Sequence, residues 1–354
     1  MKLVFILDPL AALKAYKDSS VAMLREAAAR GHTLFALRQA DIILRDNQVI
    51  GYAKPLRVTA DNANWFELGA AEATPLSHFD AVVMRKDPPF DTEYLYTTHL
   101  LELAQSHGAR VFNRPDSLRD FNEKLAIARF PQFTVPTLVT RRAAHIKEFL
   151  TEHGDVILKP LDGMGGAGIF RVRGGDANLN VIVETLTQLE TRTVMAQRYI
   201  PEITQGDKRI LLIDGEVVPF ALARIPAEGE TRGNLAAGGR GVAQPLSERD
   251  LEIAQTIAPA VRDLGLFLVG LDVLTSKSAI STSSISHDIR LHHALRGGST
   301  DMGVDCEQEC NDIHEGQRHQ CREDDLSWSE KYEECSDYRN CDDPVPVRLG
   351  CENY

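Results

Sequence analysis

A glycine-rich stretch in the middle of the sequence contains residue types that could hold a phosphate group. The segment ILKPLDGMGGAGIFR, residues 157–171, places Gly163, Gly165 and Gly166 between two apolar runs. Because glycines have no side chains, their main-chain N–H groups can approach phosphate oxygens closely. The spacing differs from G-x-x-x-x-G-K-[ST], so the stretch is not a P-loop. Phosphate binding and a hairpin tip without a ligand are both compatible with this pattern.

Two lysines near this stretch could neutralise a bound phosphate. Lys159 ends the apolar run before the glycines, and Lys124 lies in SLRDFNEKLAIARF, residues 117–130. Each has a structural alternative, because a lysine can lay its alkyl chain along apolar surface and keep its charge in water. The segment VMAQRYIP, residues 194–201, predicts a strand followed by extended chain, which either offers main-chain groups to a nucleobase or is an ordinary strand.

A second glycine-rich stretch carries arginines at regular spacing. In ARIPAEGETRGNLAAGGRG, residues 223–241, Arg224, Arg232 and Arg240 recur every eight residues. A guanidinium group binds carboxylates and phosphates through paired hydrogen bonds. Long loops inside compact domains are usually functional or disordered. We interpret this one as a lid that closes over an anionic substrate.

Alternating strands and helices are predicted over about the first 120 residues. Apolar runs predict strands at 2–9, 32–37, 81–84 and 110–113. Helical spacing and capping residues predict helices at 18–30, 92–107 and 117–130. This alternation is typical of a parallel sheet wound as in α/β domains.

From residue 134 the pattern predicts antiparallel pairs. DVILKP (155–160) and GIFRV (168–172) flank the first glycine-rich stretch as two strands. KRILLIDGEVVPFALAR (208–224) predicts a hairpin, because Asp-Gly is a strong signal for a two-residue turn. A helix at 247–265 and a buried strand at 265–274 follow.

Charge is distributed unevenly along the 354 residues. The net charge is −12, but residues 301–354 alone contain 16 Asp and Glu against 5 Lys and Arg. The rest of the chain is close to neutral, which gives no electrostatic argument for a nucleic-acid partner. No apolar run reaches the roughly 18 residues of a membrane span. Asp8 and Pro9 interrupt the first apolar run before it could act as a secretory signal, so we expect a cytoplasmic protein.

Every cysteine lies in the acidic last part of the sequence. A cysteine-rich segment is typical of proteins in oxidising compartments, whereas the cysteine-free body is typical of a cytosolic protein. The six are Cys306, Cys310, Cys321, Cys335, Cys341 and Cys351. Their spacing contains no C-x-x-C pair, which argues against a zinc site. A disulfide framework is compatible with the count, but the spacing selects no connectivity.

Five motifs, in order along the chain, carry a family resemblance. They are MRKDPPFDTEY, NRPDSLRDFNEKL, ILKPLDGMGGAGIFR, GDKRILLIDGE and ARIPAEGETRGNLAAGGRG. Over residues 1–273 the chain resembles bacterial glutathione synthetases. The resemblance implies an α/β (α+β) chain in which an N-terminal substrate-binding domain with a parallel sheet, residues 1–122, precedes an ATP-grasp domain, residues 123–274. Residues 275–354 do not match and would form a Ser/Thr-rich linker and an acidic, cysteine-rich tail without regular structure.

The resemblance also implies a reaction. It is the ligation of γ-glutamylcysteine to glycine through an acyl phosphate, driven by ATP and dependent on magnesium or manganese. Such a reaction needs no side-chain nucleophile, because positioning and charge neutralisation supply the catalysis. The family further implies a cytoplasmic homo-oligomer, expected to be a tetramer, with no nucleic-acid or membrane partner.

Roles for individual residues follow from the same resemblance. The residues implied for ATP binding are Lys124, Lys159, Gly163, Gly165, Gly166, Gln197, Tyr199, Ile200 and Asp207. The residues implied for catalysis are Arg209, Arg224, Arg232 and Arg240. Substrate carboxylates would be bound by Arg85, Arg224 and Arg232, and Asp272 would be a metal ligand.

The sequence departs from the family pattern after Asp272. The family carries Glu-Ile-Asn on the next strand, and its Glu and Asn complete the metal site. Counted without a gap, those positions are Ile280, Ser281 and Thr282, and no E-x-N occurs between Asp272 and Gly303. Magnesium is normally held by one or two carboxylates with phosphates and waters, so we expect impaired activity. A changed reading frame or a fusion near Leu274 is our hypothesis for the departure.

Two other functions are compatible with the sequence. One is a catalytically inactive ATP-binding remnant whose cysteine-rich tail serves interactions. The other is a different ATP-grasp carboxylate–amine ligase, such as a peptide or D-alanine ligase, although the arginine-rich second stretch argues against it.

Overall fold

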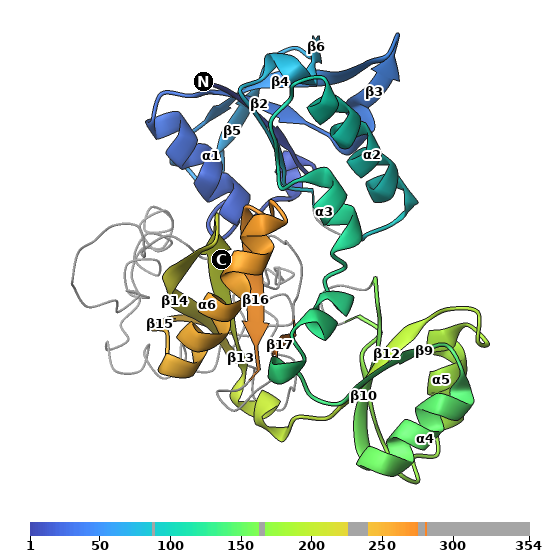
Figure 1. Cartoon of the computed structure of the whole chain (residues 1–354). Helices are drawn as coiled ribbons and strands as arrows, with labels where there is room; N and C mark the ends of the chain where they lie inside the picture. The colour runs from blue at the N-terminus through green and yellow to red at the C-terminus, as the bar shows by residue number, and fades with distance from the viewer. Residues whose placement is uncertain (87–88, 163–166, 226–239, 275–279, 282–354) are drawn as a thin grey trace, which may run out of the picture. The chain divides into compact units, whose positions relative to one another are not determined.

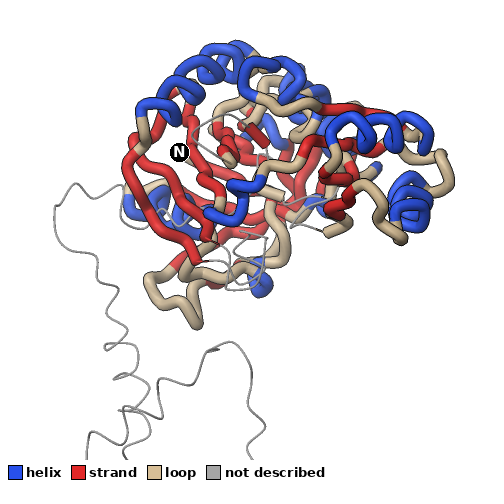
Figure 2. The backbone as a smooth tube through the Cα atoms, turned by 90° about the horizontal axis from the view of Figure 1, so that it is seen from below, coloured by secondary structure: helices blue, strands red, loops and turns tan. Residues whose placement is uncertain are grey.

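The computed structural model describes residues 1–86, 89–162, 167–225, 240–274 and 280–281. They all belong to the first of two contact units, Met1–Arg296, and the second unit, Gly297–Tyr354, lies outside the described residues. Gly163, Gly165, Gly166 and Arg232 are likewise outside, as are most of the predicted lid and nearly all of the predicted linker and tail. The described strands form three sheets (Figure 1), drawn in red in Figure 2.

The N-terminal sheet has the strand order β3-β4-β2-β1-β7-β8. Its strands are β1 (Lys2–Ile6), β2 (Thr33–Leu37), β3 (Ile42–Arg45), β4 (Gln48–Val58), β5 (Phe66–Leu68), β6 (Glu72–Pro75), β7 (Ala81–Met84) and β8 (Val111–Phe112). β1, β2, β7 and β8 are parallel, as predicted. The sheet also contains the strands β3 to β6, which pair antiparallel and make it a mixed sheet. These four strands were not predicted.

Both faces of β1 are buried, which explains its unbroken apolar sequence. Leu3 and Phe5 pack on one face in a cluster that includes Leu24 of α1 (Ser19–Ala29). Val4 and Ile6 pack on the other face in a cluster that includes residues of α2 (Thr92–Ser106). α1 begins as predicted, because the Asp18 carboxylate accepts hydrogen bonds from two main-chain N–H groups of the first turn.

The predicted helix at 117–130 is wrong. The structure has a short helix α3 (Pro115–Asp120) and then a 3-10 helix at Leu125–Arg129. The side-chain oxygen of Asn122 accepts hydrogen bonds from the main-chain N–H groups of Lys124 and Leu125, both at 3.0 Å. Asparagine competes in this way with the regular helix ladder, and Lys124 therefore lies between the two short helices. Further 3-10 helices occur at Leu10–Ala12, Gln39–Asp41, Leu76–His78, Pro131–Phe133 and Pro201–Gln205.

The second sheet is antiparallel, with the order β11-β10-β12-β9. Its strands are β9 (Thr137–Thr140), β10 (Asp155–Pro160), β11 (Phe170–Arg173) and β12 (Val194–Arg198). Strands β10 and β11 are the predicted pair around the first glycine-rich stretch. One face packs against α4 (Ala143–His153) and α5 (Leu179–Thr187) through a core that includes Val156, Leu158 and Ala196 (Figure 1).

The third sheet has the order β15-β14-β13-β16-β17. Its strands are β13 (Asp207–Ile213), β14 (Glu216–Ile225), β15 (Arg240–Pro245), β16 (Leu268–Val273) and β17 (Ile280–Ser281). The predicted hairpin is confirmed, and its turn places Asp214 and Gly215 at φ of 51° and 76°. Helix α6 (Glu248–Asp263), with the capping residue Ser247, packs against Ile210 and Leu212.

The third sheet hydrogen bonds to the end of β8. The side-chain amide of Asn113 donates to the carbonyl oxygen of Leu268 at 2.9 Å and accepts from its N–H at 2.8 Å. Phe112 and Phe267 form an edge-to-face pair with ring centroids 5.3 Å apart. No helix of the described residues is long and apolar enough to cross a membrane.

Gly206 offers a test of how tightly the third sheet is built. Its φ is +93°, and a Cβ atom there would lie 2.4 Å from the carbonyl oxygen of Arg224. We expect Gly206→Ala to lower the free energy of unfolding by at least about 2 kcal/mol, measured by urea denaturation, because the strain and the overlap both fall on main chain.

Gly174 is the matched control. A Cβ atom there would meet nothing within 4 Å. Gly174→Ala is expected to change the free energy of unfolding by no more than about 0.5 kcal/mol. Equal effects of the two substitutions would contradict the packing described here.

Candidate functional site

The second and third sheets each have one apolar face and one polar face. In an antiparallel ladder, opposite residues share a face, as do alternate residues along a strand. Lys159 is opposite Met195, and Gln197 is opposite Ile157. Lys159 and Gln197 therefore lie on the same face of the second sheet, away from the core that packs on α4 and α5. The alternation brings together a predicted phosphate ligand and a predicted adenine neighbour.

Lys159 is buried and forms no ion pair within the described residues. Only 8% of its surface is exposed. Burial, followed by the charge of Lys124, lowers the pKa of Lys159 to about 8, although Glu123 and Asp272 act in the opposite direction. A buried ammonium with a lowered pKa gains most when an anion binds beside it, which is typical of functional sites.

Lys124 is largely buried and forms an ion pair with the neighbouring carboxylate of Glu123. The side chain of Asn122 holds this turn and also donates to the carbonyl oxygen of Leu161, at 3.4 Å, close to the first glycine-rich stretch. The structure thus places Lys124 and Lys159 within electrostatic range of each other, and the charge of Lys124 acts on the pKa of Lys159.

Four charged residues form a buried cluster on the polar face of the third sheet, opposite α6. This ion quartet consists of Asp207, Arg209, Arg224 and Asp272, each with 4–9% of its surface exposed. Arg209 donates to both carboxylate oxygens of Asp272, at 2.8 and 3.0 Å. Arg224 donates to both carboxylate oxygens of Asp207, through Nε at 2.9 Å and through a second, shorter bond. Arg224 also contacts Asp272 at 2.8 Å, so it links three strands.

The ion quartet shifts the pKa values of its members. Burial, followed by the negative charge of Asp272, raises the pKa of Asp207, although Arg224 and Arg209 oppose the shift. For Arg224, burial acts to lower the pKa, but the carboxylates of Asp272 and Asp207 outweigh it and raise the pKa above its ordinary value. Among the described residues, the two positive and two negative charges of the ion quartet balance each other.

The predicted nucleoside-binding residues follow β12. The side-chain amide of Gln197 donates to the hydroxyl of Thr137 at 2.9 Å. Tyr199 donates its main-chain N–H to the carbonyl oxygen of Asp155 at 2.9 Å, and its ring lies 3.4 Å from the guanidinium carbon of Arg171. Ile200 directly precedes the 3-10 helix Pro201–Gln205.

Arg85 lies at the carboxyl end of β7, on the N-terminal sheet. It is 3% exposed and donates to the hydroxyls of Ser19 and Ser20, at 2.8 and 3.1 Å. The next residue, Lys86, forms an ion pair with Asp8 at 2.9 Å. These groups share the carboxyl ends of β1 and β7. Arg240, by contrast, is exposed at the start of β15, opposite Ile225.

The described residues do not fit a magnesium site at Asp272. The carboxylate of Asp272 already receives contacts from two guanidinium groups. β17 places Ser281 in register with Asp272, where no carboxylate is available. No group of three or more His, Cys, Asp or Glu residues that could hold a metal ion occurs in the part of the chain that the structure describes.

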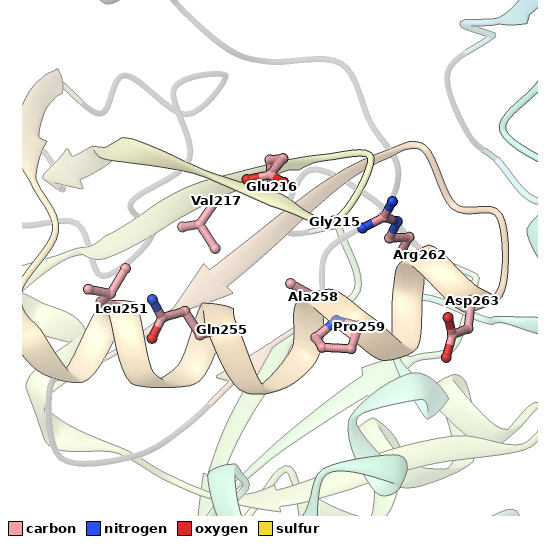
Figure 3. Close-up of a pocket in the computed structure, with 9 residues that line it drawn as sticks. All are labelled: Gly215, Glu216, Val217, Leu251, Gln255, Ala258, Pro259, Arg262 and Asp263. Carbon is pink, nitrogen blue, oxygen red and sulfur yellow. The ribbon is translucent and has the colours of Figure 1, made fainter.

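A pocket of about 510 Å³ lies away from these residues, between the β13–β14 turn and α6. Figure 3 shows Val217 of the hairpin and Ala258 of α6 pointing toward each other across it. Its lining includes none of the predicted site residues. It is therefore separate from the polar faces described above.

Sequence reasoning missed several residues that surround the predicted site. Glu123 pairs with Lys124, and Asp155 and Arg171 contact Tyr199 or its main chain. Thr137 binds Gln197. Alternation along β10, β11 and β12 would have placed most of these on one face, but only once the strand pairing was known.

Comparisons with known proteins agree over most of the chain. The family description "Prokaryotic glutathione synthetase, N-terminal domain" matches residues 1–119, and "Prokaryotic glutathione synthetase, ATP-grasp domain" matches residues 123–281. The glutathione synthetase of Nitrosomonas europaea is 62% identical over 277 residues, which cover 77% of this chain and 87% of that protein. The glutathione synthetase of Pseudomonas aeruginosa is 57% identical over 274 residues, covering 77% and 86%.

Solved structures with low sequence identity share the fold. D-cycloserine synthetase DcsG has a TM-score of 0.56 at 18% identity, covering 82% of this chain and 92% of its own. D-alanyl-alanine synthetase A from Vibrio cholerae has a TM-score of 0.50 at 14% identity, covering 81% and 88%. At these identities the likeness concerns the fold alone.

Asp272 is the residue of the ion quartet whose removal tests the charge balance. Asp272→Asn removes the buried carboxylate charge that Arg209 and Arg224 both contact. We expect the free energy of unfolding, measured by urea denaturation, to fall by about 3–5 kcal/mol.

Glu67 provides a control, because it forms an ion pair with Arg57 that is exposed to solvent. Glu67→Gln is expected to leave the denaturation midpoint unchanged, since exposed pairs contribute little. If Asp272→Asn were equally harmless, solvent and not Asp272 would be compensating Arg209.

Proposed function

The chain belongs to the prokaryotic glutathione synthetase family, and we propose that its two polar sheet faces carry out that family's ligation of γ-glutamylcysteine to glycine. The chain is thus an ATP-dependent carboxylate–amine ligase by family. The observation that carries the residue-level proposal is the arrangement of buried cations, with Lys159 on the second sheet and Arg209 and Arg224 on the third. The two sheets are near each other electrostatically, because the charge of Asp272 acts on the pKa of Lys159.

In this proposal, Lys124 and Lys159 bind the phosphates of ATP. Lys159 is suited to this role because it is buried without an ion pair among the described residues. The glycines Gly163, Gly165 and Gly166 would add main-chain N–H groups, but they lie outside the described residues. Gln197 on the same sheet face, with Tyr199 and Ile200 after the end of β12, would form the adenine pocket, and Asp207 would bind the ribose.

The guanidinium groups of the ion quartet act on the transferred phosphoryl group and the substrate carboxylate. A carboxylate oxygen of the dipeptide attacks the γ-phosphorus of ATP, and ADP leaves. The glycine amine then attacks the acyl carbon, phosphate leaves, and the amine loses a proton. Arg209 and Arg224 would stabilise the negative charge that develops, held in position by Asp272 and Asp207.

The remaining predicted residues complete the proposal. Arg85 would bind a carboxylate at the carboxyl ends of β1 and β7, where ligands of parallel sheets commonly bind. Arg232, which lies outside the described residues, and Arg240 would close over the substrates. The domain division 1–122, 123–274 and 275–354, the homo-oligomer and the cytoplasmic location stay predictions that rest on the family.

We expect turnover to be impaired in this chain. ATP-grasp ligases use ATP and magnesium, whereas Asp272 is neutralised by Arg209 and Arg224, and Ser281 stands in register with it. The proposal therefore routes no step through a metal at Asp272. An ATP-binding protein with little or no turnover is the second candidate, and the same observation favours it.

Phosphate release by the full-length protein tests the proposed reaction. ATP, γ-glutamylcysteine, glycine and magnesium are supplied together and then omitted one at a time. We expect release that needs all the substrates, at a rate at least about 100-fold below that of the Nitrosomonas europaea enzyme, because the described residues offer Asp272 no second carboxylate for a metal-centred charge contribution.

Two results would change the proposal. Release at the rate of the relative would contradict the expected impairment, because the charge that the described residues do not supply would then come from elsewhere in the chain. Release without the dipeptide or without glycine would contradict the proposed ligation.

The pKa of Lys159 predicts how phosphate binding depends on pH. At about pH 7 its ammonium is mostly charged, and at about pH 9 it is mostly neutral, because the pKa is about 8. We expect the affinity for ATP to fall as pH rises through this window, by up to about tenfold per pH unit, with proton uptake on binding. Isothermal titration calorimetry in buffers of different ionisation enthalpy measures both.

Lys159→Met should weaken ATP binding near pH 7 and remove this pH dependence. Lys147 serves as the control because it lies exposed on α4. Lys147→Met is expected to leave both the affinity for ATP and its pH dependence unchanged. An affinity of the unsubstituted protein that stays constant across the window would mean that Lys159 does not contact the phosphates.

A further inference from the structure

Arg171 stands at one end of a row of side chains that crosses the second sheet. Arg171 is in register with Ile157, Ile157 with Gln197, and Gln197 with Thr137. Because opposite residues of an antiparallel ladder share a face, these four side chains lie on the face that carries Lys159. None of the roles assigned above includes Arg171.

Arg171 is fixed by two different partners. Its Nε lies 2.9 and 3.2 Å from the carboxylate oxygens of Asp155, and its NH2 nitrogen donates to the same carboxylate at 2.5 Å. Its guanidinium carbon lies 3.4 Å from the centre of the Tyr199 ring. This hydrogen bonding raises the pKa of Arg171 and lowers the pKa of Asp155. The guanidinium group therefore has a defined plane and a ring stacked on it.

Asp155 also holds the main chain of Tyr199. Its carbonyl oxygen accepts the Tyr199 N–H at 2.9 Å. The segment after β12 is consequently held twice, through its main chain by Asp155 and through its ring by Arg171. Stacking between a guanidinium group and an aromatic ring is favourable and restricts the orientation of both.

The distance between Lys159 and Asp155 along β10 indicates what shape of ligand this face could bind. Asp155 and Lys159 are four residues apart on β10, a span of about 13 Å at roughly 3.3 Å per residue. A ligand lying along β10 with its anionic end at Lys159 would have its other end near Tyr199. A nucleoside triphosphate has this elongated shape, with charge at one end and a flat ring at the other.

We infer that Arg171 is a positioning residue for the nucleobase: it holds the Tyr199 ring, and with it the chain at Ile200, in the orientation that receives the base. The inference rests on the proposed nucleotide site. It adds a residue on β11 that sets affinity for the base end of the nucleotide and leaves the phosphate end unaffected.

A comparison with Arg173 distinguishes a positioning role of Arg171 from a purely structural ion pair with Asp155. It lies two residues further along β11 and donates to the same carboxylate of Asp155 at 3.2 Å. Its side chain is 63% exposed, against 34% for Arg171, and the close ring contact of Tyr199 is with Arg171. A role in pairing with Asp155 alone would apply to both arginines.

Two probes that share the phosphate end test the inference on the full-length protein. Binding of ATP and of inorganic tripolyphosphate is measured by calorimetry in magnesium-free buffer. Arg171→Gln and Tyr199→Leu are each expected to weaken ATP binding about tenfold and to leave tripolyphosphate binding unchanged. Arg171→Lys keeps the charge but loses the planar fork, so ATP binding should stay weakened. Arg173→Gln should bind both probes as the unsubstituted protein does.

Combining the two substitutions tests whether the residues act as a unit. If the two residues act as a unit, their effects on ATP binding do not add. The variant with both Arg171→Gln and Tyr199→Leu should therefore bind ATP about as tightly as the weaker-binding of the two single variants. Unchanged ATP binding by Arg171→Gln, or an equal loss for ATP and tripolyphosphate, would overturn the inference. Failure of the unsubstituted protein to bind either probe would instead overturn the proposed nucleotide site.

Discussion

Two guanidinium groups and two carboxylates share a buried face of the third sheet, and their balance of charge constrains the rest of the site. Arg224 reaches from β14 to partners on β13 and β16, so the three strands are held in register by side chains as well as by main chain. A buried ion pair contributes little net stability when complete, but an unbalanced charge in the same place is strongly unfavourable. The loss of one of the four charges is therefore unfavourable unless a second charge of opposite sign is lost with it.

This balance has a direct bearing on metal binding. A divalent cation beside Asp272 would need the carboxylate that Arg209 and Arg224 now share. Extra carboxylates from a neighbouring strand would compensate for that demand, yet the residue in register with Asp272 is Ser281. On the second sheet the situation is reversed, since Lys159 is buried with no ion pair among the described residues and its pKa is lowered. Among the described residues, the third sheet pairs its buried charges with one another, whereas the second sheet carries a buried cation that favours an incoming anion.

Local signals in the sequence were sufficient for much of the fold. Asp18 predicts the start of α1, Asp214-Gly215 predicts the hairpin, and the apolar run before Asp272 predicts β16. The helix at 117–130 was wrong because the side chain of Asn122 competes with the helix ladder, an effect that spacing alone does not reveal. The family resemblance assigned Asp207 to ATP binding, Arg209 and Arg224 to catalysis and Asp272 to metal binding, but it did not indicate that the four pair with one another. Their mutual pairing depends on strand register, which is a property of the assembled sheet.

The hydrogen bonds between Asn113 and Leu268 join residues 155 positions apart in the chain. During synthesis, the end of β8 is made long before its partner, and β16 is the last of the longer strands of the third sheet to be made. The hairpin of β13 and β14 can form early because its contacts are local, whereas contacts of high sequence separation form slowly. The nascent chain must therefore keep a partly finished sheet, with charged residues on one face, in water until Leu268 arrives. The contacts that join the third sheet to β8 can therefore form only after three quarters of the chain has been made, whatever the stability of the finished protein.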